Sequence, residues 1–149
     1  MKKIIKTAFV GVGIIIACIF IAVYLFSSCN KKIKIDYYSK EENYIIARGT
    51  LVHMKYSDDS SVLYLGFSDL EPAFADTAFK IVGNNLNIAK KNGINEKLEM
   101  GKTIEFITAP RYWGDGFVYP IVAITVDGKT LLEVEEGLPN FLEHLKTNE

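Results

Sequence analysis

The sequence predicts an N-terminal transmembrane or signal helix followed by a single, mainly β domain of the α+β class. Three observations lead to this prediction. Residues 8–26 form an uncharged apolar run. Residues 44–126 contain five segments rich in β-branched and aromatic residues, a composition typical of strands. Two helical patterns complete the domain, a short one between the third and fourth strands and an amphipathic one near the C-terminus.

The apolar run is nineteen residues long and contains no charged side chain and no Asn, Gln, Pro or His. At about 1.5 Å of rise per residue, a helix of this length matches a hydrocarbon layer of about 30 Å. Backbone groups in lipid must bond to one another, so a helix is the expected state. A buried helix of a soluble protein would show a polar face, and this run shows none.

Two outcomes remain open for this segment, and Cys29 decides between them. Either the helix stays as a single-span anchor, or it is a lipoprotein signal that is removed before an acylated Cys29. The residues FSSC at 26–29 resemble a lipobox, because small residues precede the Cys and polar residues follow it. Phe26 stands where Leu is usual, and the run is longer than the ~7–15 apolar residues of a cleaved signal. The sequence slightly favours the lipoprotein.

Lysines flank the run on both sides, so the charge balance does not determine its orientation. The basic start and the lipobox-like Cys29 favour export of the rest of the chain. We therefore predict a domain on the extracytoplasmic side of the cell membrane. The membrane itself is the predicted partner, through residues 8–26 or a lipidated Cys29.

Charge and cysteine content narrow the classes of partner. Residues 30–149 carry 14 basic and 18 acidic side chains, a net charge of −4. Phosphate binding needs clustered positive charge, so we expect no nucleic-acid partner. Cys18 and Cys29 are the only cysteines, so the domain has no disulfide.

The predicted organisation is an anchor or signal at 1–29, a tether at 30–43 with a short strand at 33–38, and one domain at 44–149.

The predicted strands are separated by turn residues. Gly49 in the first strand suggests a bulge or bend, and Pro120 in the fifth requires an edge position or a bulge. Asp127-Gly128 predicts a hairpin that adds a sixth strand. The strands are expected at residues 44–56, 61–67, 77–82, 103–108, 117–126 and 129–134.

Two helices are predicted from spacing. Residues 85–92 form a short helix, with Gly93 as a left-handed C-cap. At the C-terminus Leu138, Phe141, Leu142 and Leu145 stand at i, i+3, i+4 and i+7, with Pro139 in the first turn.

The order of elements over residues 44–126 resembles the OB-fold, a five-stranded barrel with a helix between its third and fourth strands. The resemblance is carried by element order alone, without a sequence motif. An SH3-like barrel or a small open sheet with a packed helix would give a similar order.

The strongest candidate binding segment is residues 109–119, APRYWGDGFVY, which contains the only Trp and one of two Arg residues. Aromatic faces beside an Arg suit a planar ligand, a sugar ring or a peptide side chain. In the alternative interpretation Trp113 and Phe117 fill the end of the barrel. Asp58 and Asp59, in the first hairpin turn, are expected at the same end as this loop. The predicted contacts are Arg111, Tyr112, Trp113, Asp115, Tyr119, Asp58 and Asp59.

Residues for catalysis or metal binding are sparse. Neither His53 nor His144 stands in a nucleophile motif, and no spacing fits calcium or zinc ligands. We therefore expect no cofactor and no metal, and favour a non-catalytic module that binds a protein or envelope ligand. Two alternatives remain. One is a hydrolase or other enzyme that uses Asp115, His53 or a carboxylate pair, and the other is a structural subunit that docks through the C-terminal leucine stripe.

Overall fold

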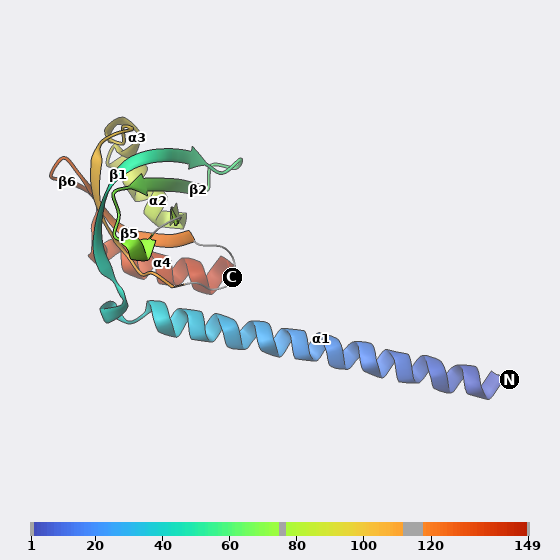
Figure 1. The fold of residues 1–149 in the computed structure, drawn as a ribbon. Helices are drawn as coiled ribbons and strands as arrows, with labels where there is room; N and C mark the ends of the chain where they lie inside the picture. The colour runs from blue at the N-terminus through green and yellow to red at the C-terminus, as the bar shows by residue number, and fades with distance from the viewer. Residues whose placement is uncertain (1, 75–76, 112–117, 149) are drawn as a thin grey trace. The chain divides into compact units, whose positions relative to one another are not determined.

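The computed structural model describes residues 2–74, 77–111 and 118–148, with side chains described from Cys18 onward except at residues 22, 26 and 73. The chain forms two compact units, Met1–Lys34 and Ile35–Glu149. The second unit is a mixed α+β domain built around a closed five-stranded barrel with a C-terminal helix (Figure 1). The predicted class of the domain is therefore confirmed.

The first helix, α1, runs from Lys2 to Tyr38 and includes the apolar run. The short strand predicted at residues 33–38 is therefore wrong, and the 3₁₀ helix η1 follows at Glu41–Asn43. The last turn of α1 belongs to the second unit, where the Tyr38 ring is 2% exposed and packs edge-on against Phe141. Among the residues that the structure describes, none of the helices is long and apolar enough to cross a membrane.

Strand pairing closes the barrel. The sheet order is β3-β2-β1-β4-β5-β6, and a parallel pairing between β3 and β5 joins the ends of the five-stranded part. Closure of the barrel excludes the open-sheet alternative. The strand order, with α2 (Gly83–Lys91) between β3 and β4, is consistent with an OB-like barrel. The strands are β1 (Ile45–Tyr56), β2 (Val62–Ser68), β3 (Ala78–Val82), β4 (Thr103–Thr108), β5 (Val118–Val126) and β6 (Lys129–Leu132).

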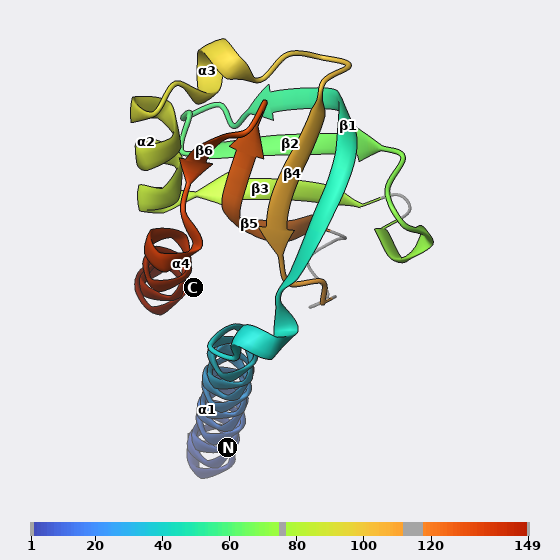
Figure 2. The same ribbon diagram turned by 90° about the vertical axis from the view of Figure 1, so that its left-hand side faces the viewer.

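The long strand β1 is shared between two neighbours (Figure 2). Its first half pairs with β4 and its second half with β2, and the change of partner falls at Thr50. The irregularity predicted at Gly49 lies instead between Leu51 and His53. Gly49 has a different role: a Cβ there would lie 2.7 Å from the Leu70 side chain and 2.8 Å from that of Phe67. The glycine is needed because this strand packs closely against its neighbour.

Pro120 marks a similar change of partner in β5. Residues 118–120 pair with β3, and the following residues pair with β4. The β4–β5 register shifts at Thr108, as the predicted bulge requires. The Thr108 hydroxyl donates a buried 2.7 Å hydrogen bond to the Pro120 carbonyl. Proline is tolerated here because the irregular ladder does not require its missing N–H.

Two apolar cores hold the domain together. The first fills the barrel, where the rings of Phe67, Phe79 and Phe106 contact one another at centroid distances of 4.6–5.5 Å. The second lies outside the barrel, where Phe141 and Leu145 of α4 (Val134–Asn148) pack on other buried side chains, Val122 among them. One outer surface of the barrel is therefore covered by α4.

The C-terminal helix is longer than predicted. α4 begins at Val134, so Pro139 lies inside the helix rather than in its first turn. Glu135 and Glu136 occupy the first turn, where negative charge complements the helix dipole. Of the leucine stripe, Phe141 and Leu145 are buried in the domain's own core and the other two members are half-buried. The stripe therefore does not form the exposed docking surface that the structural-subunit alternative requires.

Two shorter helices lie between β3 and β4. The helix predicted at residues 85–92 is confirmed as α2, and Gly93 has a left-handed φ of 91°, as expected for its cap. A further helix, α3 (Ile94–Lys97), was not predicted. The buried Asn85 side chain in α2 donates a 2.8 Å hydrogen bond to the Gly137 carbonyl of α4. This bond ties the two helices to each other.

Candidate functional site

The aromatic loop of the predicted site falls largely outside the described residues. Tyr112, Trp113 and Asp115 belong to the segment 112–117, of which the structure gives no account. Arg111, just before it, is exposed, and its guanidinium lies 4.7 Å from the centre of the Tyr37 ring. The Tyr37 hydroxyl donates a 3.2 Å hydrogen bond to the Pro110 carbonyl. The beginning of the loop is therefore held against the last turn of α1.

Tyr119, the last residue of the predicted site, lies in the barrel interior. It is 7% exposed, and its ring contacts those of Phe74 and Phe79. Its register with Phe79 places both side chains on the inner face of the sheet. Tyr119 is therefore a core residue and not part of a binding surface.

Asp59 builds the first hairpin turn. Its carboxylate accepts hydrogen bonds from the Ser57 hydroxyl at 2.6 Å and from the Ser61 N–H at 3.0 Å. The Ser61 hydroxyl donates to the same carboxylate at 2.8 Å. These hydrogen bonds lower the pKa of Asp59 to about 2, and the one from Ser57 has the largest effect. Asp58 is exposed at the tip of the same turn.

The described residues that follow the turn and the aromatic loop lie at different ends of β3. The turn leads into Val62, which pairs with Val82 at the end of β3. The loop leads into Val118, which pairs with Ala78 at the start of β3. The prediction that the loop lies at the same end as Asp58 and Asp59 concerns residues 112–117, which are outside the described residues. Val62 and Val118 mark the two ends of β3. Between them lies the outer face of β1, β2 and β3.

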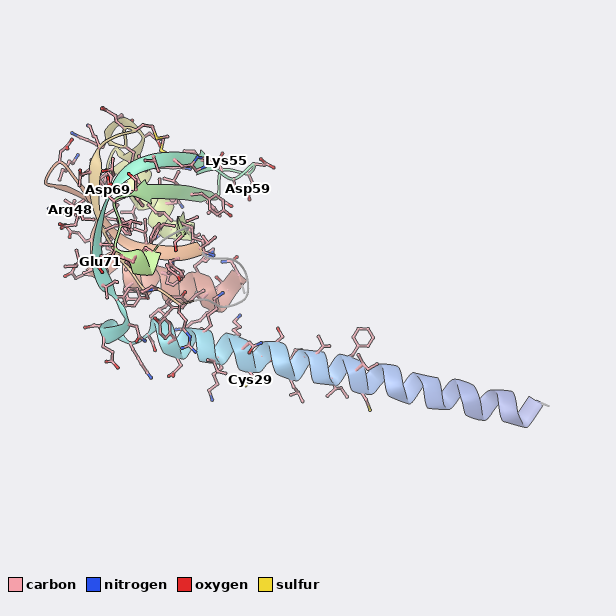
Figure 3. All side chains as sticks on the ribbon, viewed as in Figure 1. Cys29, Arg48, Lys55, Asp59, Asp69 and Glu71 are labelled. Carbon is pink, nitrogen blue, oxygen red and sulfur yellow. The ribbon has the colours of Figure 1, made fainter. Side chains whose placement is uncertain are left out.

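This outer face carries a row of cationic and aromatic side chains. Lys55 pairs with Tyr64, and Tyr64 pairs with Lys80, so the three stand side by side across three strands. Their neighbours Leu63, Leu65, Phe79 and Ile81 are buried in the barrel, so the row points outward. Lys55 is exposed, and the other two side chains are half-buried. Figure 3 shows Lys55 near the end of β1 and Asp59 in the turn that follows.

The adjacent row, beside Tyr64, has Gly66 at its centre, where a Cβ would lie 3.1 Å from the Cβ of His53. His53 pairs with Gly66, and Gly66 pairs with Ala78, so the side chains there are one exposed imidazole and two small groups. Within the described part of the chain, neither Lys55 nor Lys80 forms an ion pair. We name the five residues Lys55, Tyr64, Lys80, His53 and Gly66 the cationic face. Sequence reasoning missed it, because the strands were predicted but their mutual register was not.

Neither histidine has a catalytic setting within the described residues. His53 is exposed on β1, and the Asp115 proposed as its partner lies outside the described residues. His144 on α4 is near the Asn148 side-chain amide, at 3.2 Å from its Nδ1. No group of three His, Cys, Asp or Glu side chains in the described ranges could hold a metal ion.

A groove lies on another part of the domain. It has a volume of about 520 Å³ and extends between the start of β1, the end of β4 and the first turns of α4. A shallower depression of about 120 Å³ adjoins it and shares Ile46, Ile107 and Val134. Another depression, of about 350 Å³, is lined by Arg48, Asp69 and Glu71, and there Arg48 pairs with Glu105 at 2.7 Å (Figure 3).

The fold is that of a small α+β domain with a closed five-stranded β-barrel and a C-terminal helix. No protein-family model, curated protein or solved structure compared with this chain matches it.

Proposed function

We propose that the protein is a membrane-anchored, non-catalytic binding module on the extracytoplasmic side of the cell membrane. Its ligand is an envelope component that carries both a ring and an anionic group, as an acidic saccharide does. The observation that supports this proposal best is the row Lys55–Tyr64–Lys80, an aromatic ring between two cations on the outside of an apolar barrel.

The chemistry of the row selects the ligand class. A tyrosine ring offers a flat apolar surface to a sugar ring, and its hydroxyl adds a hydrogen bond. Lysine ammonium groups attract carboxylate or phosphate groups on either side. Gly66 and Ala78 add only small groups beside Tyr64, so they place no large side chain next to its ring. The overall charge of −4 on residues 30–149 argues against a long polyanion such as nucleic acid.

The membrane location is supported by the apolar run at residues 8–26 and by Cys29. Cys29 has a free thiol and is exposed on α1. Both forms of attachment are compatible with these features: a retained helix, or an acylated Cys29 after removal of the preceding residues. In either form the binding domain follows directly after the attachment point.

The proposal is tested with the full chain in lipid nanodiscs, with a short oligogalacturonate as the acidic saccharide probe. Isothermal titration calorimetry should detect binding that weakens about tenfold in Tyr64→Ala, since an aromatic contact contributes roughly 1.5 kcal/mol. Lys55→Glu and Lys80→Glu should weaken it further and remove much of its salt dependence.

Lys129→Glu on β6 is the matched control, because it makes the same charge change away from the cationic face. Equal losses in Lys129→Glu and Lys80→Glu would show that overall charge, and not this face, attracts the probe. Absence of binding by the unmodified chain would exclude acidic saccharides of this kind. Tighter binding of a single-stranded oligonucleotide than of the saccharide would replace the proposed ligand class.

A further inference from the structure

The groove beside α4 carries chemistry different from that of the cationic face. Six of the side chains that line it are Tyr44, Ile45, Ile46, Ile107, Val134 and Leu138. Ile46 is 70% exposed and Ile45 is 39% exposed, although both lie in a strand of the barrel. Contiguous exposed apolar side chains of this kind mark an interaction surface more often than a chance feature.

The polar members of the groove are all acidic. Glu41 and Glu135 line the groove itself, and Glu133 lines the adjoining depression. No Lys or Arg side chain lines either hollow, and within the described residues these three carboxylates form no ion pair. Glu105 in the adjoining depression is already neutralised by Arg48. The groove therefore combines an apolar floor with a rim of uncompensated negative charge.

We propose that this groove is a docking site for a cationic amphipathic segment of a partner protein. Apolar side chains of that segment would cover Ile45 and Ile46, and flanking Lys or Arg side chains would reach Glu41 and Glu135. An anionic membrane surface is not the expected occupant of the groove, because its negative charge repels the acidic side chains of the rim. The volume of about 520 Å³ falls within the range of sites that hold side chains or small ligands.

This site is independent of the cationic face. The two share no residue, and they prefer ligands of opposite charge. The module therefore has the means to hold an anionic ligand on one surface and a basic partner segment on another, as an adaptor does.

The test uses the full chain in nanodiscs of zwitterionic lipid and a short synthetic peptide of alternating Ile and Lys. A peptide of alternating Ile and Glu serves as its counterpart. A carbodiimide joins a lysine amine to a carboxylate with loss of water, so mass spectrometry can map which carboxylates contact the bound peptide. We expect cross-links from the basic peptide at Glu41, Glu133 and Glu135. The acidic peptide has no lysine amine to cross-link, so its binding is measured by calorimetry, which should detect none.

Affinity measurements on paired variants locate the apolar contact. Ile46→Ser should weaken peptide binding about tenfold, as expected for loss of one buried aliphatic side chain. Val52→Ser is the matched control, because Val52 is also exposed on β1, at 56%, and does not line the groove. Both substituted side chains are exposed in the domain, so both variants should fold.

A second pair isolates the charge. The double substitution Glu41→Gln and Glu135→Gln should weaken binding and reduce its salt dependence, whereas Glu143→Gln on the same helix should not. Unchanged binding in Ile46→Ser, or cross-links spread over carboxylates away from the groove, would overturn the proposal. Cross-links from the groove to lysines of another copy of this chain would overturn it too, and would identify that copy as the occupant. Tyr64→Ala should leave peptide binding unchanged, so failure of one site does not depend on the other.

Discussion

Asp59 shows how one carboxylate can be used entirely for local structure. Sequence patterns predicted the turn correctly but also suggested a ligand contact, because an exposed acid in a loop is typical of both. The hydrogen bonds from Ser57 and Ser61 occupy the carboxylate within the turn. Asp58, one position away, is exposed as Asp59 is, but it accepts none of these hydrogen bonds.

The pKa of Asp59 yields a prediction for stability against pH. The folded pKa of about 2 lies below the ordinary value of 3.8, so ionised Asp59 favours the folded state. Its contribution should be complete above pH 3.8 and lost as the pH falls towards 2. Urea unfolding of Asp59→Ala should therefore show a deficit that is largest near neutral pH and shrinks across this window.

Asp58→Ala is the matched control, because it removes an exposed carboxylate from the same turn and keeps the hydrogen bonds of Asp59. A deficit in Asp59→Ala that stays constant from pH 7 to pH 2 would contradict the assigned role of the carboxylate.

At the scale of elements, the contact between α4 and β5 depends on one glycine. A Cβ at Gly137 would lie 1.8 Å from the Val122 carbonyl oxygen, which is backbone and cannot move aside as a side chain can. The helix therefore sits as close to the strand as its backbone allows. Phe141 and Leu145 fill the remainder of this contact.

Gly137→Ala sets two effects against each other. In an unconstrained helix, alanine is favoured over glycine by up to about 1 kcal/mol. Here the overlap with Val122 should displace α4, and overpacking of this kind costs about 1–3 kcal/mol. We expect net destabilisation of about 2 kcal/mol in chemical denaturation. Glu143→Ala is the control, an alanine substitution on the exposed side of α4, and it should change stability little. If Gly137→Ala were more stable than the unmodified chain, the contact between α4 and β5 would be looser than described.

For the whole molecule, we propose that attachment to the membrane determines where both proposed sites act. We expect the mature protein to begin at an acylated Cys29, since the residues at 26–29 resemble a lipobox. Intact mass spectrometry of protein purified from membranes measures this directly. Cys29→Ser should block processing, and Cys18→Ser should not. A full-length mass that begins at Met1 would establish the alternative, a retained helix.

Local patterns in the sequence were sufficient for the class of the domain and the order of its six strands. Alternating apolar residues, turn residues and the Gly93 cap act over a few positions, so the strands of the barrel and α2 could be located without knowledge of distant contacts. The extent of α4 was underestimated, because Pro139 suggested a helix start that packing on β5 overrides.

The tertiary structure alone decided which side chains share a surface. Strand register depends on the shift after Leu51, on the change of partner at Pro120 and on closure through β3 and β5. Local signals at Gly49 and Pro120 predicted irregular strands, but they did not give the partner strands or the register. These pairings brought Lys55, Tyr64 and Lys80 into one row and turned Tyr119 into the core. The physical reason is the two-residue period of a strand, because one bulge reverses the face that each later side chain occupies. The position of each strand and helix therefore follows from local sequence pattern, whereas the composition of each surface follows from long-range strand pairing.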